Sequence, residues 1–106
     1  MSVESVPPEI SEWIKTRQDL IAKALRRSRY SQAQDDPKRW TLDLLTDLSA
    51  IETEARRAVH LLTTYASRAD VARPTEVAVA SHVTVTTVAS RAGSRLAQDV
   101  WREVQP

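Results

Sequence analysis

Apolar residues recur at three- and four-residue steps along much of the chain, which is the pattern of amphipathic helices. From residue 9 to 29 this repeat predicts a first helix, with glutamates at its start and cations at its end, as a helix dipole favours. Its apolar positions are Ile10, Trp13, Ile14, Leu20, Ile21, Ala24 and Leu25. Residues 1–8 lack the repeat, so we expect a flexible N-terminal arm.

A second apolar stripe runs from Trp40 to Ala66. Asp36-Pro37 predicts where it starts, because aspartate caps helices and proline suits the first helical turn. The stripe fits one unusually long helix, or two helices with a bend near residues 46–49. The stretch SRADVARP is expected to end this helical region, with Pro74 as the helix breaker.

The stretch EVAVASHVTVTTVASRAG, residues 76–93, supports two interpretations. Valines alternate with small or polar residues as in a strand, and β-branched residues favour strands. Residues 76–88 would then form a hairpin that turns at Ser81-His82. Such a hairpin is marginal alone and would need a strand from a second subunit, as in ribbon-type dimeric DNA binders. The turn also lacks the Asn-Gly or Asp-Gly pair that two-residue hairpins favour.

The same stretch also fits two short helices joined by a tight turn. Thr75 would cap the first helix, His82 would take the turn, and Thr84 would cap the second. From there the apolar positions share one face, so the second helix is expected to continue to the C-terminus. These positions are Val85, Val88, Ala89, Ala92, Leu96, Val100 and Val104.

Composition favours the helical interpretation. The chain has 106 residues, a net charge of +1, no cysteine and one glycine, Gly93. A single glycine argues against hairpin-rich β architecture and against a glycine-rich phosphate loop. The sequence holds no membrane-length apolar run and no basic and apolar secretory leader, so a cytoplasmic protein is expected. Twelve of the fifteen cations are arginine, which suits contacts with phosphate and guanine.

The segment TEVAVASHVTVTTVASR resembles helix-turn-helix DNA-binding motifs. Within it, TVASRAGSRL is similar to the recognition helix of promoter-reading domains of sigma factors and related regulators. The resemblance covers roughly residues 51–97 and implies that Ala78 packs between the two helices and that Val88 anchors the second. His82 stands where the motif usually has glycine. The late position of the motif that is usually apolar falls on Arg91, or on Ala92 if the register shifts by one residue, which would move the groove-facing positions by one.

The resemblance and the helical repeat together predict an all-α fold, a single domain over residues 9–106. It would hold a helix-turn-helix core near residues 75–93 and an additional N-terminal amphipathic helix. The DNA-binding residues would be Thr84, Thr86, Thr87, Ser90, Arg91, Ser94 and Arg95. On a continuous helix Arg91 and Arg95 would repel each other, a cost that an anionic partner offsets.

A denser group of cations could hold the phosphate backbone beside this motif. The predicted phosphate contacts are Lys23, Arg26, Arg27, Arg29 and Arg73. The alternative for the cluster at residues 23–29 is a solvated helix end that completes the helix dipole.

These features predict a sequence-specific duplex DNA-binding protein, a small transcriptional repressor or mobile-element regulator that acts as a homodimer. No catalytic residue, metal, cofactor, small-molecule ligand or membrane contact is predicted. His60 and His82 lack zinc-site spacing, and no serine lies in a Gly-x-Ser-x-Gly motif. The alternatives are a helical protein-protein adaptor that does not bind DNA, and the ribbon-type dimer.

Overall fold

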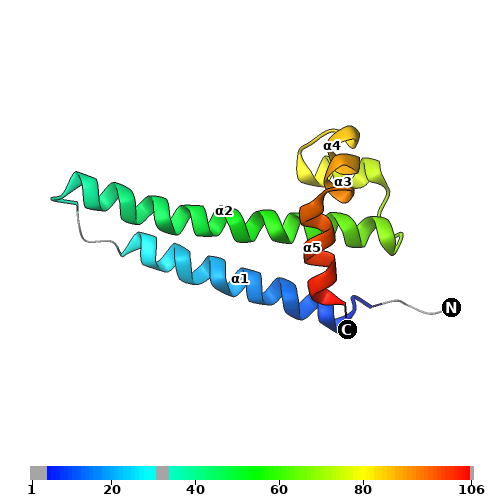
Figure 1. The fold of residues 1–106 in the computed structure, drawn as a ribbon, viewed down its shortest axis with the longest axis horizontal. Helices are drawn as coiled ribbons and strands as arrows, with labels where there is room; N and C mark the ends of the chain where they lie inside the picture. The colour runs from blue at the N-terminus through cyan, green and yellow to red at the C-terminus, as the bar shows by residue number, and fades with distance from the viewer. Residues whose placement is uncertain (1–4, 31–33, 106) are drawn as a thin grey trace. The chain divides into compact units, whose positions relative to one another are not determined.

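The computed structural model describes residues 5–30 and 34–105, and within those ranges all the regular structure is helical (Figure 1). The predicted all-α fold is confirmed. The helices are α1 (Pro8–Arg29), α2 (Pro37–Arg68), α3 (Pro74–Ser81), α4 (Val85–Ala92) and α5 (Arg95–Val104). The strand interpretation of residues 76–88 is wrong, because both halves of that segment are helical.

Two compact units make up the chain, Met1–Arg56 and Arg57–Pro106. The boundary between them falls inside α2, which is one continuous helix of 32 residues, so the long-helix interpretation of the second stripe is correct. Because a single helix belongs to both units, the predicted single domain over residues 9–106 stays a prediction. The flexibility of the predicted N-terminal arm, residues 1–8, also stays a prediction, because residues 1–4 lie outside the described ranges. Its last residue, Pro8, is the first residue of α1.

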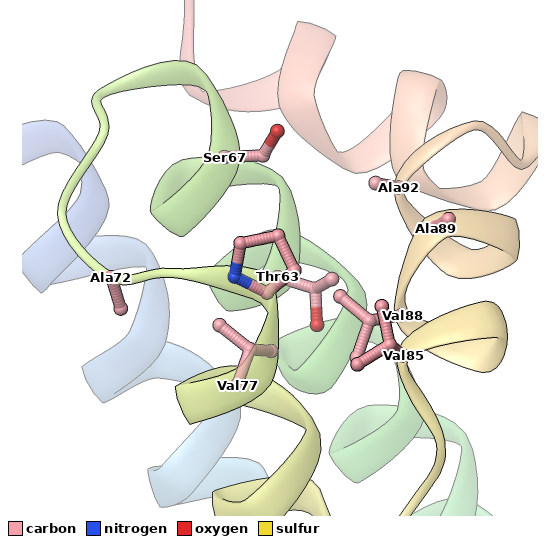
Figure 2. Close-up of a pocket in the computed structure, with 9 residues that line it drawn as sticks. Thr63, Ser67, Ala72, Val77, Val85, Val88, Ala89 and Ala92 are labelled. Atoms are coloured by element: carbon pink, nitrogen blue, oxygen red, sulfur yellow. The ribbon is translucent and has the colours of Figure 1, made fainter.

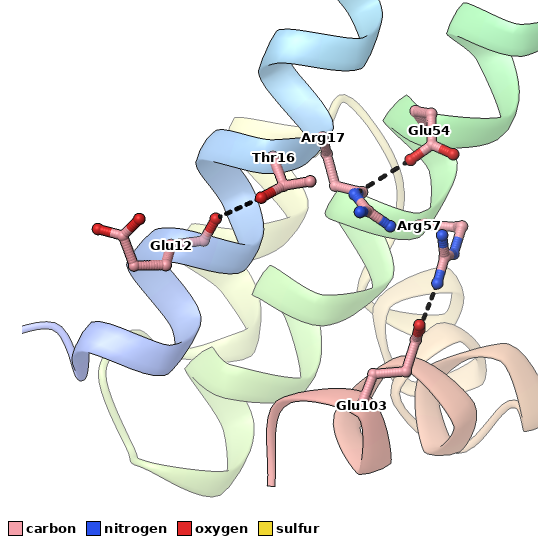
Figure 3. Close-up of polar contacts among 6 residues, drawn as sticks. All are labelled: Glu12, Thr16, Arg17, Glu54, Arg57 and Glu103. Atoms are coloured by element: carbon pink, nitrogen blue, oxygen red, sulfur yellow. Dashed lines mark hydrogen bonds and ion pairs between the residues drawn. The ribbon is translucent and has the colours of Figure 1, made fainter. Parts of the chain in front are cut away.

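In the first unit, α1 and the first part of α2 run antiparallel (Figure 1). Arg17 Nε lies 3.2 Å from a carboxylate oxygen of Glu54, and both side chains are largely sheltered from water (Figure 3). Near the other end of α1, Arg27 Nε donates to Asp47 Oδ1 at 3.1 Å. The start of α2 matches the prediction, since Asp36 Oδ1 accepts a hydrogen bond from the Arg39 backbone N–H at 3.2 Å.

The second unit packs the end of α2 with the three short helices around a small aliphatic core. Leu61 and Val100 are its largest fully buried side chains. Ala78 and Ala97 are also buried in this core. Arg57 forms an ion pair with Glu103, which joins α2 to α5 within this unit (Figure 3). The core therefore fixes α4 and α5 on residues 57–68 of α2.

The turn between α3 and α4 depends on a left-handed residue. His82 has φ 59° and ψ 39°, and the Val83 backbone N–H bonds the Ala78 carbonyl at 3.0 Å, as in a Schellman motif. Thr84 then caps α4, because its Oγ1 accepts a hydrogen bond from the Thr87 backbone N–H at 3.1 Å. The predictions for His82 and Thr84 are confirmed. The predicted cap at Thr75 is wrong, since α3 begins at Pro74 with Arg73 as its N-cap.

Replacing His82 by glycine is expected to stabilise the protein by about 1 kcal/mol, because the left-handed backbone then carries no Cβ. Urea unfolding followed by circular dichroism measures the change. His82→Ala keeps the Cβ and is the control. An equal gain in both variants would show that the imidazole, and not the backbone, carries the cost.

The predicted continuous helix from Val85 to the C-terminus is wrong. The helix ends at Ala92 and a new one begins at Arg95. Gly93 has φ −91°, which any residue adopts, so the interruption depends on Ser94. Ser94 is extended, its Oγ accepts a hydrogen bond from the Ala97 backbone N–H at 3.1 Å, and its hydroxyl donates to the Arg91 carbonyl at 2.7 Å. Local capping thus overrides an apolar repeat that passes through the interruption.

Ser94→Ala should lower the free energy of unfolding by about 1 kcal/mol, the usual effect of removing an N-cap hydroxyl. The measurement is urea unfolding, with Ser90→Ala as the control, since Ser90 is exposed on α4. Equal losses in the two variants would contradict the capping role.

Candidate nucleic-acid interface

The outer face of α4 carries small hydroxyl side chains. Val88 is buried, and Thr86 and Ser90, two residues before and after it, are exposed. Two residues correspond to about 200° of helical rotation, so these two hydroxyls lie nearly opposite the buried valine. This face is free of bulky apolar groups and can donate and accept hydrogen bonds.

The N-terminal end of α4 extends this hydroxyl face. Thr84 is exposed, and its Oγ1 lies 3.1 Å from Thr87 Oγ1, within hydrogen-bond distance. Thr87 is half-buried. Four of the predicted DNA-binding residues therefore lie on this part of α4. Thr84 and Thr87 are at its N-terminal end, and Thr86 and Ser90 are on its outer face.

Arg91 takes a different position from the other predicted residues. It is half-buried and lines a pocket of about 660 Å³ together with Leu62, Val77 and Ala80. The side chain thus occupies the apolar place that the helix-turn-helix pattern implies there. An arginine can fill such a place with its methylene stem and leave its guanidinium group toward water.

Ser94 and Arg95 do not continue the outer face of α4, because the helix ends before them. Ser94 is a half-buried cap whose hydroxyl bonds the backbone on both sides of the interruption. Arg95 is exposed as the first residue of α5. The predicted repulsion between Arg91 and Arg95 on one helix is wrong for the same reason.

The predicted phosphate contacts are divided between the two units. Arg73 precedes α3 and is exposed, and its Nε lies 3.4 Å from Glu76 Oε1. The other four, Lys23, Arg26, Arg27 and Arg29, lie in the last two turns of α1, in the first unit. Arg27 is engaged with Asp47, and its side chain is still 60% exposed. The candidate residues that lie on or next to α3, α4 and α5 therefore all belong to the second unit.

Charge differs between the units. The second unit, residues 57–106, has six arginines against four carboxylates, whereas the first has nine cations against ten carboxylates. Sequence reasoning did not single out Arg68, whose guanidinium lies 5.3 Å from the centre of the Trp101 ring. Arg68 and Trp101 are 33 residues apart in the sequence, so no local motif indicates this contact between α2 and α5. The positive excess lies in the unit that carries α4.

A second, smaller pocket of about 210 Å³ opens between the end of α2, α3 and α4 (Figure 2). Aliphatic side chains dominate its walls, among them Val77, Val85 and Val88. The Thr63 hydroxyl, also in the wall, donates to the Val59 carbonyl of its own helix at 2.7 Å. The pocket is thus an imperfectly filled part of the packing between these helices.

Comparison of the chain with protein-family models, curated proteins and solved structures finds no match. In the described ranges, no helix combines the length and apolar character needed to cross a membrane. The same residues bring together no group of three or more potential metal-ligating side chains.

Proposed function

We propose that this protein binds duplex DNA in a sequence-dependent way, with α3 and α4 acting as a helix-turn-helix motif and α4 as its recognition helix. The observation that carries the proposal is the exposed hydroxyl face of α4, set opposite the buried Val88. An α-helix of this width fits the major groove, where side-chain hydroxyls can pair with base edges.

The turn supports this proposal. The resemblance places a left-handed residue between the two helices, and His82 has that conformation. Ala78 is buried where the motif packs a small residue, and Val88 is buried where the motif anchors its second helix. These three agreements depend on backbone geometry and burial, which the sequence resemblance alone did not contain.

The residues of the motif would have distinct roles. Thr86 and Ser90 would read base edges, while Thr84 and Thr87 at the start of α4 would contact the phosphate backbone. Arg73 and Arg95 are exposed at the starts of α3 and α5 and would add phosphate contacts. Such contacts position a protein on DNA without reading its sequence.

A homodimer is part of the proposal, because a single small helix-turn-helix unit reads few base pairs. Two-fold dimers place two recognition helices about one DNA turn apart. The protein would then act as a small repressor or as a regulator of a mobile element.

Selection from random duplexes, followed by titration of the enriched site at increasing salt, tests the proposed function. We expect an enriched site with two-fold symmetry, and affinity that falls steeply with salt as counterions are released. No binding at low salt would overturn the proposal and favour a protein-protein adaptor. Equal affinity for all duplexes would overturn its sequence-reading part.

A further inference from the structure

The first unit leaves a large apolar surface uncovered. Among the described residues of this unit, Ile10 and Ala24 are the buried apolar side chains. Leu45 and Leu48 of α2 are 54% and 50% exposed, and Leu25 of α1 is 47% exposed. A pair of helices has no second layer to cover these leucines, and helical domains gain most of their stability from such covering.

Leu45 and Leu48 belong to one apolar stripe on α2. Leu44, Leu45, Leu48 and Ile51 follow three- and four-residue steps and share a face of the helix. Leu44 and Ile51 are half-buried and mark the side of the stripe nearer α1. The ion pair between Arg27 and Asp47 brings the end of α1, and with it Leu25, level with this stripe. We call this surface the leucine face.

Charge is distributed unevenly along the same hairpin. Its tip, the described residues of 23–43, holds six cations and three carboxylates. Its base, residues 5–22 and 44–56, holds three cations and six carboxylates. The tip therefore has a net charge of about +3 and the base about −3 at neutral pH.

We infer that the leucine face is covered by the leucine face of a second copy of this chain, with the two hairpins antiparallel. That arrangement places each basic tip beside the acidic base of its partner, whereas a parallel arrangement would place like charges together. The inference deepens the proposed homodimer and rests on it.

The whole side of the helix pair that carries the leucine face is large enough for a stable dimer. A helix of 22 residues is about 33 Å long, so two adjacent helices present roughly 700 Å². Stable interfaces bury about 800 Å² on each partner. The two-fold pair would form a bundle of four helices, and its apolar core would bury the leucine faces of both copies.

Sedimentation equilibrium of the full chain without DNA tests the leucine face. The wild type is expected at twice the chain mass of 11.9 kDa. In the variant Leu45→Glu/Leu48→Glu the dimer dissociation constant should rise about 100-fold or more, since two-fold symmetry places four carboxylates in the interface. Thr46→Glu/Thr53→Glu is the matched control, because both threonines are exposed and lie about 160° and 140° around α2 from Leu48.

Circular dichroism of each variant checks that the helices remain. A wild-type monomer at tens of micromolar protein would overturn the inference, and so would a dimer that Leu45→Glu/Leu48→Glu leaves intact. In the second case a dimer through another surface would still serve the proposed DNA binding, so the two failures are distinguishable.

Cross-linking tests the antiparallel arrangement, and the absence of cysteine makes the chain suitable for it. Gln34→Cys labels the tip, and Ser11→Cys labels the base. A bismaleimide should join a tip variant to a base variant in mixed samples and should not join two tip variants. Efficient tip-to-tip cross-linking would show a parallel pair and overturn this part of the inference.

Discussion

The double variant Thr86→Glu/Ser90→Glu is expected to lose at least about 100-fold in affinity for the selected duplex, the equivalent of two lost base contacts. Both side chains lie on the exposed face of α4, so two new carboxylates would meet the groove and its phosphates. The change should not unfold the protein, because glutamate is a good helix former and Thr86 lies in the first turn of α4.

Fluorescence anisotropy with the labelled duplex measures this loss. Gln98→Glu/Gln105→Glu is the matched control, since it adds the same charge to exposed positions of the second unit away from α4. The control should weaken binding only through its small effect on net charge. A similar loss in both double variants would show that α4 has no special role and that overall charge decides the affinity.

Leu61→Ala should lower the free energy of unfolding by about 3 kcal/mol. Leu61 is completely buried in the second unit, and its truncation removes apolar contacts and leaves a cavity. A loss of this size is a large fraction of the stability of a small protein. We expect urea unfolding followed by circular dichroism at 222 nm to show it as an earlier midpoint.

The neighbouring residue supplies the control for that experiment. Leu62 is 47% exposed on the same helix, so Leu62→Ala removes a similar side chain that is much less buried. Its effect should stay below about 1 kcal/mol. Equal losses at the two positions would contradict the assignment of Leu61 to the core.

The helices of this protein could be predicted because their apolar repeats and end signals agree. Asp36-Pro37 begins α2, and Thr84 caps α4, as the sequence indicates. The valine-rich segment was ambiguous in composition, yet its turn lacked the residues that a hairpin needs. A left-handed histidine is compatible with a helix-turn-helix motif but costs more than glycine, so His82 fits the helical interpretation at an energetic penalty.

The errors occurred where a single side chain overrides a periodic pattern. The apolar repeat from Val85 to Val104 passes through residues 93 and 94 without a defect, but the Ser94 hydroxyl caps a new helix there. At the start of α3, Glu76 accepts a hydrogen bond from the Arg73 backbone N–H at 2.9 Å, and this interaction places the cap two residues before Thr75.

The candidate site was only partly predictable for a related reason. Thr86 and Ser90 follow directly from the helical repeat around Val88, so a local pattern was enough to place them. Arg91, in contrast, is half-buried and lines a pocket with Leu62, Val77 and Ala80, which come from two other helices. Burial of that kind is a tertiary property and cannot be derived from the sequence of α4 alone.

The most direct test of the central proposal is to record ¹⁵N–¹H spectra of the full chain while the selected duplex is added. We expect the largest amide shifts at Thr84, Thr86, Thr87 and Ser90, with smaller shifts near Arg73 and Arg95. Shifts concentrated in the first unit, or no shifts at a duplex excess, would contradict the assignment of α4 as the recognition helix.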